Sequence, residues 1–201
     1  MAKILQINSG VLADNSQSNQ LADQFAQQWL AAHPGHELLK RDLANENLPH
    51  LDLAFLTALG TDPAQRNPEQ QERVALADQI IEQVEQAEVL VIGLPLYNFG
   101  VPSQLKSYFD YLCRAGRTFN YTEQGPVGLL QGKKAYVLAA RGGVYSNTPG
   151  DTQTAFVQQL LGFLGFTQVE FIYAEGLNMG EEARTQALAA ANQAIAAAIA
   201  S

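Results

Sequence analysis

The stretch Ile4–Leu21, ILQINSGVLADNSQSNQL, decides the fold. Its first residues continue the apolar segment 3–8, which is typical of a buried strand, and residues 17–33 have the spacing of an amphipathic helix. Between them the chain turns through Gly, Ser, Asn and Asp without a single Lys or Arg. A strand that passes through such a turn into a helix predicts a βα unit with a small, neutral loop at the sheet edge.

The same alternation continues along the chain. Further strands are predicted at 36–41, 88–93, 133–140 and 168–174, and further helices at 68–87, 102–116, 151–164 and 180–200. Alternating elements of these lengths imply right-handed crossovers and a parallel sheet covered on both faces. We therefore expect one domain over residues 1–201, an α/β three-layer sandwich of flavodoxin-like type, with a five-stranded parallel sheet of order 2-1-3-4-5. The segment 46–66 reads as an insertion with a short helix that could cover a partner or a ligand mouth.

Composition excludes several classes of function. A net charge of −8 with scattered Lys and Arg disfavours a nucleic-acid or membrane surface. The first residues resemble neither a secretory signal nor a membrane span, so a cytoplasmic protein is expected. The one cysteine, Cys113, lies at helical spacing from apolar residues, and we interpret it as a core residue in preference to a catalytic thiol. His33, His36 and His50 show no metal-ligand spacing, so no metal site is expected.

Three loops follow strands that are central in the expected order, and ligands of such folds bind outside the carboxyl ends of the strands. In the first, Ser16, Gln17 and Ser18 open a helix, where free N–H groups attract an anion. The open alternative is that they only cap the helix. Neither a GxxxxGK[ST] nor a GxGxxG motif occurs, which argues against a P-loop hydrolase and a Rossmann dinucleotide site.

The other two loops suit a flat ring. In PLYNFGVPSQLKSYFD (95–110), prolines stiffen both ends, Gly100 permits an unusual backbone angle, and Tyr97 and Phe99 either wall a ring or pack under the next helix. In the loop after the fourth strand, Gly142 and Gly143 permit close backbone approach, while Arg141 is either a ligand contact or a surface residue. An anion site, a ring wall and a glycine turn at one edge favour flavin mononucleotide (FMN).

Five segments resemble, in order and spacing, the bacterial FMN-dependent NADH azoreductases, also described as NADH:quinone oxidoreductases. They are SQSNQL (16–21), the loop and helix 95–110, RAGRTFNYTEQGPVGL (114–129), GKKAYVLAARGG (132–143), and LGFLGF (161–166) followed by EFIYAEG (170–176). The resemblance covers nearly the whole chain. It implies a homodimer with one tightly bound FMN per subunit at the interface, and ping-pong transfer of electrons from NADH to quinones or to azo dyes, which are cleaved to aromatic amines.

The resemblance also implies residue roles. FMN chemistry needs no catalytic side chain of its own here, and the implied cofactor-binding residues are Ser9, Gly10, Ser16, Gln17, Ser18, Pro95, Leu96, Tyr97, Asn98, Phe99, Ala140, Arg141, Gly142 and Gly143. The implied substrate-binding residues are Asn98, Phe99, Tyr121 and Phe163. Gly10 and Ala140 depart from the family, which commonly has a hydroxyl side chain at each; each loss is worth about 1 kcal/mol. Ser9 or a water is a candidate replacement at the first position, and we expect FMN to be retained.

Two rival functions share the fold. A one-electron carrier of flavodoxin type would bind FMN and serve a partner protein without oxidising NADH. A phospho-acceptor signalling domain is disfavoured, because NSG (8–10) and PLYNF (95–99) stand where acidic residues would be required. No residue pattern marks the physiological acceptor or a preference for NADH over NADPH.

Overall fold

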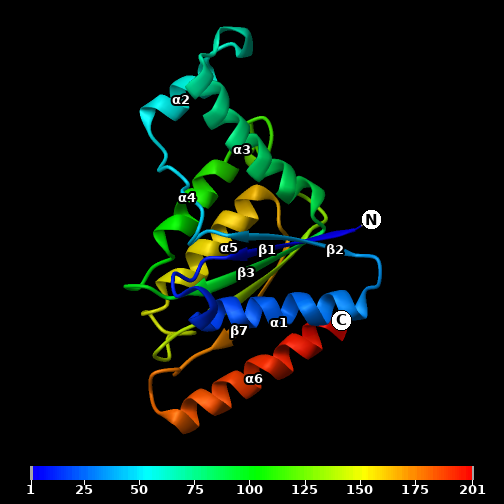
Figure 1. Ribbon diagram of the computed structural model, residues 1–201, viewed down its shortest axis with the longest axis vertical. Coiled ribbons are helices and arrows are strands. Elements are labelled where there is room, and N and C mark those ends of the chain that lie inside the picture. The colour runs from blue at the N-terminus through cyan, green and yellow to red at the C-terminus, as the bar shows by residue number, and fades with distance from the viewer. Residues whose placement is uncertain (1, 201) are drawn as a thin grey trace.

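The sheet has the predicted order. The computed structural model describes residues 2–200, and five parallel strands run in the order β2-β1-β3-β6-β7, which is 2-1-3-4-5 when the five are numbered along the chain (Figure 1). Their bounds are Lys3–Asn8 (β1), Glu37–Asp42 (β2), Val89–Pro95 (β3), Lys134–Ala140 (β6) and Gln168–Ala174 (β7). The expected flavodoxin-like sandwich is confirmed.

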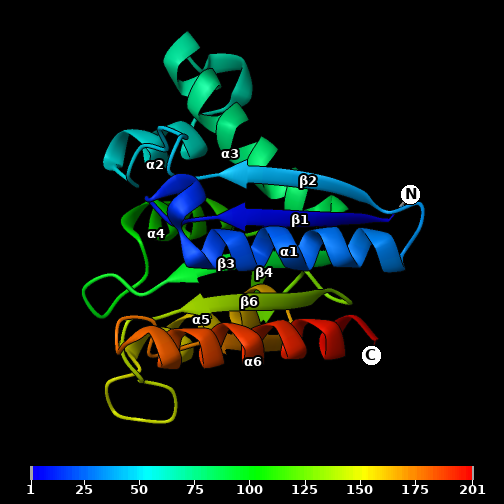
Figure 2. The same cartoon turned by 60° about the horizontal axis from the view of Figure 1, so that its bottom comes forward.

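Helices cover both faces of the sheet because the central strands are apolar on both sides. Ile4 and Val91 pack with α1 and α6 on one face, whereas Leu5 and Ile92 pack with α3, α4 and α5 on the other. The helices are α1 (Gln17–Ala32), α3 (Pro68–Gln86), α4 (Ser103–Leu112), α5 (Thr152–Leu164) and α6 (Glu181–Ala200). In Figure 2, α1 and α6 lie side by side and begin at the same end of the sheet. Among the helices of residues 2–200, none is long and apolar enough to cross a membrane.

Local signals explain where helices begin and end. At the start of α3, Gln70 N–H donates to Asn67 Oδ1 (2.9 Å), and Asn67 N–H donates to Gln70 Oε1 (3.0 Å). This reciprocal capping satisfies two N–H groups that an uncapped helix leaves free. At the end of α5, Gly165 has a φ of 111°, a left-handed conformation that favours glycine.

The insertion 46–66 contains the expected short helix, α2 (Leu53–Gly60), followed by the 3-10 turn η2 (Pro63–Gln65). Asp52 caps α2 by accepting from Phe55 N–H (2.8 Å). Phe55 is buried against Tyr111, with ring centroids 4.8 Å apart, whereas Leu53 is 79% exposed. The helix therefore packs against α3 and α4, on the sheet face away from α1.

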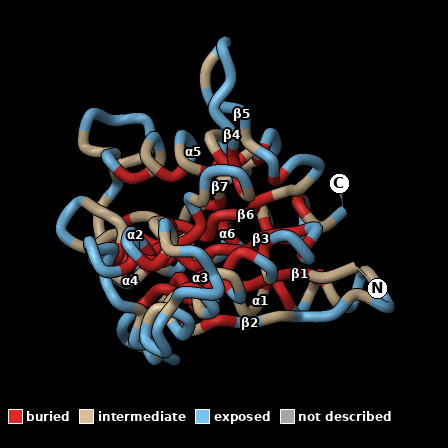
Figure 3. The backbone as a smooth tube through the Cα atoms, turned by 90° about the horizontal axis from the view of Figure 1, so that it is seen from above, coloured by how far each residue is buried: buried red, intermediate tan, exposed pale blue. Residues whose placement is uncertain are grey.

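The sequence did not predict a β-hairpin that the structure contains. An antiparallel hairpin, β4 (Phe119–Thr122) and β5 (Gly125–Gly128), projects from the body of the fold (Figure 3). It follows α4, which ends at Leu112 and not at the predicted residue 116. The helix stops there because Thr118 Oγ1 donates to Leu112 O (2.6 Å) and accepts from Arg114 N–H (2.9 Å). The interpretation of Cys113 as a core residue is wrong: it lies beyond the helix end and is exposed.

Candidate functional site

A cleft of about 350 Å³ opens at the carboxyl ends of β1, β3 and β6, where the strand order reverses. Residues from all three predicted loops line it. Nine of the predicted cofactor-binding residues do so: Ser16, Gln17, Ser18, Pro95, Leu96, Tyr97, Ala140, Arg141 and Gly142. Five lining residues were not predicted: Leu12, Asn15, Leu177, Asn178 and Arg184. Ser9, Gly10, Asn98, Phe99 and Gly143 are not part of the lining.

One end of the cleft is the first turn of α1. Ser16 occupies the N-cap position, yet its side chain makes no capping bond; its Oγ lies 3.0 Å from Ser18 Oγ. The first intrahelical bond runs from Gln20 N–H to Ser16 O (3.0 Å). The N–H groups of residues 17–19 therefore precede the hydrogen-bonded ladder. The capping alternative does not hold for the Ser16 hydroxyl, and the turn keeps donors for an anion.

The backbone of Gly10 is hydrogen-bonded to the first turn of α1. Asn19 Oδ1 accepts from Gly10 N–H (3.0 Å), and Asn19 Nδ2 donates to Gly10 O (3.1 Å). A Cβ at position 10 would overlap the Ser16 side chain, so Ser16 Oγ occupies the space into which a serine at position 10 would extend. Ser9 is fully buried and its hydroxyl donates to Gly93 O (2.6 Å), so it joins β1 to β3 and does not face the cleft.

The loop after β3 forms a tight reverse turn. Tyr97 and Gly100 exchange two backbone bonds of 3.2 and 2.9 Å. Gly100 was expected to permit an unusual backbone angle, but the left-handed angles of this turn are at its neighbours. Asn98 and Phe99 have φ values of 49° and 63°, a region that non-glycine residues rarely adopt. Tyr97 Oη accepts from Val11 N–H (3.1 Å), which ties this turn to the loop after β1. Asn98 and Phe99 point outward, and Phe99 is 61% exposed.

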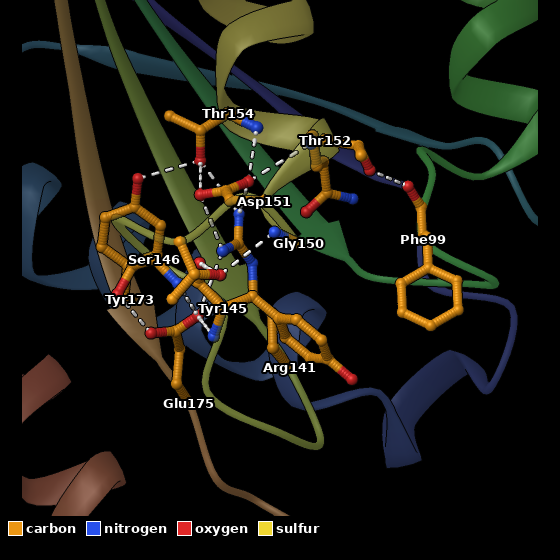
Figure 4. A network of polar contacts seen from close by, with 12 residues as sticks. Phe99, Arg141, Tyr145, Ser146, Gly150, Asp151, Thr152, Thr154, Tyr173 and Glu175 are labelled. Atoms are coloured by element: carbon orange, nitrogen blue, oxygen red, sulfur yellow. Dashed lines mark hydrogen bonds and ion pairs between the residues drawn. The ribbon is translucent and has the colours of Figure 1, made fainter.

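Arg141 is not a surface residue; it lines the cleft, and among residues 2–200 its buried Nε has no hydrogen-bond partner. Its side chain is buried and donates to Asp151 and Glu175 in ion pairs of 3.0 Å each, and to Thr154 Oγ1 (3.0 Å) (Figure 4). Burial alone raises the pKa of Asp151, but hydrogen bonds from Arg141 and Thr154 outweigh it and bring the pKa down to about 2. Burial likewise raises the pKa of Glu175, and donors from Ser146, Tyr145 and Arg141 lower it below its usual range.

The glycine turn that follows is held by its carbonyl groups. Asn178 N–H donates to Gly142 O (2.9 Å), and Gly176 N–H donates to Gly143 O (3.0 Å). Within residues 2–200 the N–H groups of Gly142 and Gly143 have no hydrogen-bond partner. A Cβ at Gly142 would lie 2.6 Å from Asn178 Nδ2, so any larger residue there requires the Asn178 side chain to move. The turn therefore presents backbone donors beside the cleft.

The start of α5 joins the two walls. Thr152 Oγ1 donates to Phe99 O (Figure 4). The buried Gln153 Nε2 donates to Pro95 O (2.8 Å) and Gly100 O (3.1 Å). Sequence reasoning missed these residues, because a Gln or Thr in the first turn of a helix is unremarkable by itself.

The predicted substrate residues lie elsewhere in the single chain. Tyr121 is on the hairpin and 76% exposed. Phe163, on α5, lines a separate apolar groove with Cys113, Phe156, Gln159 and Leu160. Phe119 links the two, with ring centroids 5.3 Å from Tyr121 and 4.4 Å from Phe163. The structure thus brings these two residues near each other but not to the cleft.

A doubly wound sheet of this order, with a ligand cleft at its switch point, defines a protein of the flavodoxin-like class, and a profile of the flavodoxin-like fold matches residues 2–199. Over 97% of each chain, the sequence is 50% identical to an FMN-dependent NADH:quinone oxidoreductase of Cellvibrio japonicus. The chain belongs to the family of FMN-dependent NADH:quinone oxidoreductases and azoreductases.

Solved structures agree with this assignment. An azoreductase of Bacillus anthracis strain Sterne is 33% identical and superposes with a TM-score of 0.89 over 99% of both chains. An FMN-dependent NADH-azoreductase of the Ames Ancestor strain, solved in complex with FMN, is 28% identical, with a TM-score of 0.90 over 100% of this chain and 98% of that one.

Proposed function

We propose that this protein is an FMN-dependent oxidoreductase that takes electrons from NADH and passes them, in ping-pong order, to quinones and to azo compounds. The observation that carries the proposal is the cleft itself: helix donors at one end and a rigid loop and glycine turn at the other, in a chain of this family.

The residues of the cleft fit FMN at its phosphate end. A phosphate there would meet the free N–H groups of residues 17–19, the positive end of the α1 dipole, and the hydroxyls of Ser16 and Ser18. Ser18 is buried and Gln17 is half-buried, so these donors lie in a partly water-excluded site where each hydrogen bond is stronger than in bulk water.

The other end suits a planar ring system. Pro95, Leu96 and Tyr97 give one wall, and Gly142 gives the backbone approach opposite. When bound, FMN supplies the chemistry of accepting a hydride and passing on electrons. The chain contributes orientation and electrostatics: the free N–H groups of Gly142 and Gly143 favour negative charge that develops beside them, and no side chain need act as acid or base.

Two further parts of the proposal concern the homodimer interface and the cellular compartment. Tyr121 and Phe163 are outside the cleft of their own chain, so we infer that they reach a substrate only across the interface of a homodimer, where they would cover the open ring face. The exposed aromatic and apolar groups of the hairpin and the Phe163 groove are the surface we assign to that interface.

We expect the reaction in the cytoplasm, where NADH is available and the single cysteine stays reduced.

Steady-state oxidation of NADH with menadione or an azo dye, with and without added FMN, tests the function. We expect FMN-dependent turnover with both acceptors and parallel double-reciprocal plots, the pattern of ping-pong kinetics. FMN binding without any NADH oxidation would contradict the enzyme and favour a one-electron carrier instead.

A further inference from the structure

Arg184 differs from every other arginine of the described chain. Across residues 2–200, the guanidinium groups of the other six have a partner: a carboxylate for Arg41, Arg73, Arg114, Arg117 and Arg141, and backbone carbonyls for Arg66. The Arg184 side chain has no ion pair and no hydrogen bond, although Glu181 and Glu182 stand in the same helical turn. The residue is half-buried at the cleft, so its guanidinium is available to a ligand that enters there.

Its position points to the same conclusion. Arg184 lies in the first turn of α6 and lines the cleft together with Ser16, Gln17 and Ser18. The helices α1 and α6 pack side by side and begin at the same end of the sheet (Figure 2). Arg184 therefore lies in a helix on the same sheet face as α1, away from the face that carries α3, α4 and α5.

Charge completes the argument. The α1 turn offers neutral hydroxyls and backbone N–H groups, whereas a phosphate monoester carries close to two negative charges at neutral pH. The other arginine in the cleft, Arg141, has both terminal nitrogens bound to Asp151, Glu175 and Thr154. Arg184 is then the cationic side chain of the cleft lining that is free to pair with the phosphate, and a planar guanidinium matches phosphate oxygens in a bidentate manner.

We propose that Arg184 is a ligand of the FMN phosphate and makes this site prefer FMN over riboflavin, an inference that rests on the proposed function. Removing it weakens FMN binding about 10- to 100-fold, the range of a charged hydrogen bond, and leaves riboflavin binding unchanged because riboflavin lacks the phosphate. The FMN dissociation constant of the unaltered chain also rises more steeply with salt than that of the variant.

The experiment titrates the full chain, freed of flavin, with FMN and with riboflavin, following the quenching of flavin fluorescence. It compares the unaltered chain with Arg184→Gln, Arg184→Lys and the control Lys106→Gln, which removes one positive charge from an exposed ion pair with Asp110. We expect a selective loss of FMN affinity for Arg184→Gln, a smaller one for Arg184→Lys, and none for the control. Circular dichroism melting checks that each variant folds.

Each of the following outcomes would overturn the proposal. Equal losses for FMN and riboflavin would mean that Arg184 shapes the cleft without contacting the phosphate. Unchanged FMN affinity in Arg184→Gln, with a raised KM for NADH or NADPH, would assign the guanidinium to the nicotinamide dinucleotide. If the unaltered chain binds neither flavin, the proposed function fails together with the role of Arg184; if it binds FMN and the variant binds it equally, only the role of Arg184 fails.

Discussion

Arg141 shows how a single buried charge organises one wall of the cleft. Its guanidinium fixes Asp151 at the start of α5 and Glu175 at the end of β7, and Glu175 in turn accepts from Tyr145 and Ser146 N–H at 2.9 Å each. The loop 142–150 is therefore tied at both ends. If one carboxylate is lost, the buried guanidinium keeps a single ion pair and has donors without a partner, which lowers stability.

Asp151→Asn is expected to lower the free energy of unfolding by about 1–3 kcal/mol, since it removes one of the two carboxylates that pair with Arg141 while Glu175 stays in place. Asp110→Asn is the matched control: it breaks the exposed pair with Lys106 and is expected to cost about 0–1 kcal/mol. Urea unfolding followed by circular dichroism measures both. Equal losses in the two variants would show that the Arg141 network stabilises the fold no more than an exposed ion pair does.

Asp151 also predicts a pH dependence. Its folded pKa is about 2, below the ordinary value of 3.8, so the stability it contributes is present above pH 4 and is lost as the pH falls toward 2. The loss amounts to about 2 kcal/mol. Urea midpoints measured from pH 6 to pH 2 should fall more steeply for the unaltered chain than for Asp151→Asn, which has no carboxylate to titrate there. Parallel curves would contradict this assignment.

At the scale of elements, the start of α5 holds both loops that wall the cleft. The amide of Gln153 binds two carbonyls, one at the end of β3 and one in the turn beyond it. Consecutive left-handed residues at Asn98 and Phe99 cost energy, and such a turn persists where its surroundings hold it in place. The helix thus stabilises a strained loop beside the cleft, at the end that we propose holds the planar ring of FMN.

Gln153→Met keeps the side chain's length and removes the donor. It is expected to lower the free energy of unfolding by about 1–3 kcal/mol, because the carbonyls of Pro95 and Gly100 lose their partner, and to weaken FMN binding several-fold by loosening the turn. Gln158→Met, at an exposed position of the same helix, is the control and should change neither quantity. Fluorescence titration and urea unfolding measure the pair. Normal FMN affinity in Gln153→Met would contradict the claim that Gln153 holds the loop after β3 in the shape that binds FMN.

The elements most visible in the sequence were those whose signals are local. The central strands are apolar runs, and the cap of α3 is predicted by Asn67, Pro68 and Gln70. The hairpin was missed because FNYT and GPVG (119–122 and 125–128) are short and largely exposed, so they lack the apolar run that marks a strand. The helix before it was overextended because Thr118, which ends it, acts from six residues beyond Leu112.

In the cleft, too, residues with local sequence signals were predicted, and residues placed by tertiary packing were not. Ser16, Gln17, Ser18 and the glycine turn were predictable, because parallel strands deliver their exit loops to one edge. Gln153 and Arg184 were not, since their positions depend on how α5 and α6 pack on the sheet. The backbone angles beside Gly100 were not predicted for a related reason. Its neighbours Asn98 and Phe99 adopt the left-handed angles, and contacts from a helix about fifty residues later in the chain hold this turn.

At the scale of the molecule, both helical layers pack against one parallel sheet. Its central strands are buried on both faces, so α1 and α6 on one side and α3, α4 and α5 on the other share the same β-strand backbone. Neither layer can lose its packing without exposing apolar strands. We therefore propose that residues 1–201 unfold as a single unit, and that the cleft, built from loops of three strands, forms only when the whole sheet does.

The single tryptophan makes this testable. Trp29 is buried on the α1 face, whereas far-UV circular dichroism reports helices on both faces. In the flavin-free chain, the thermal curves from Trp29 fluorescence and from circular dichroism should coincide, as a two-state transition requires. FMN at about 100 times its dissociation constant should raise the midpoint by about 5 to 10 °C, because it binds only the folded form. Riboflavin at equal concentration, which lacks the phosphate, should raise the midpoint less. Separate transitions for the two probes would mean that the helical layers unfold independently, and an unchanged midpoint with FMN would mean that the cleft does not hold it.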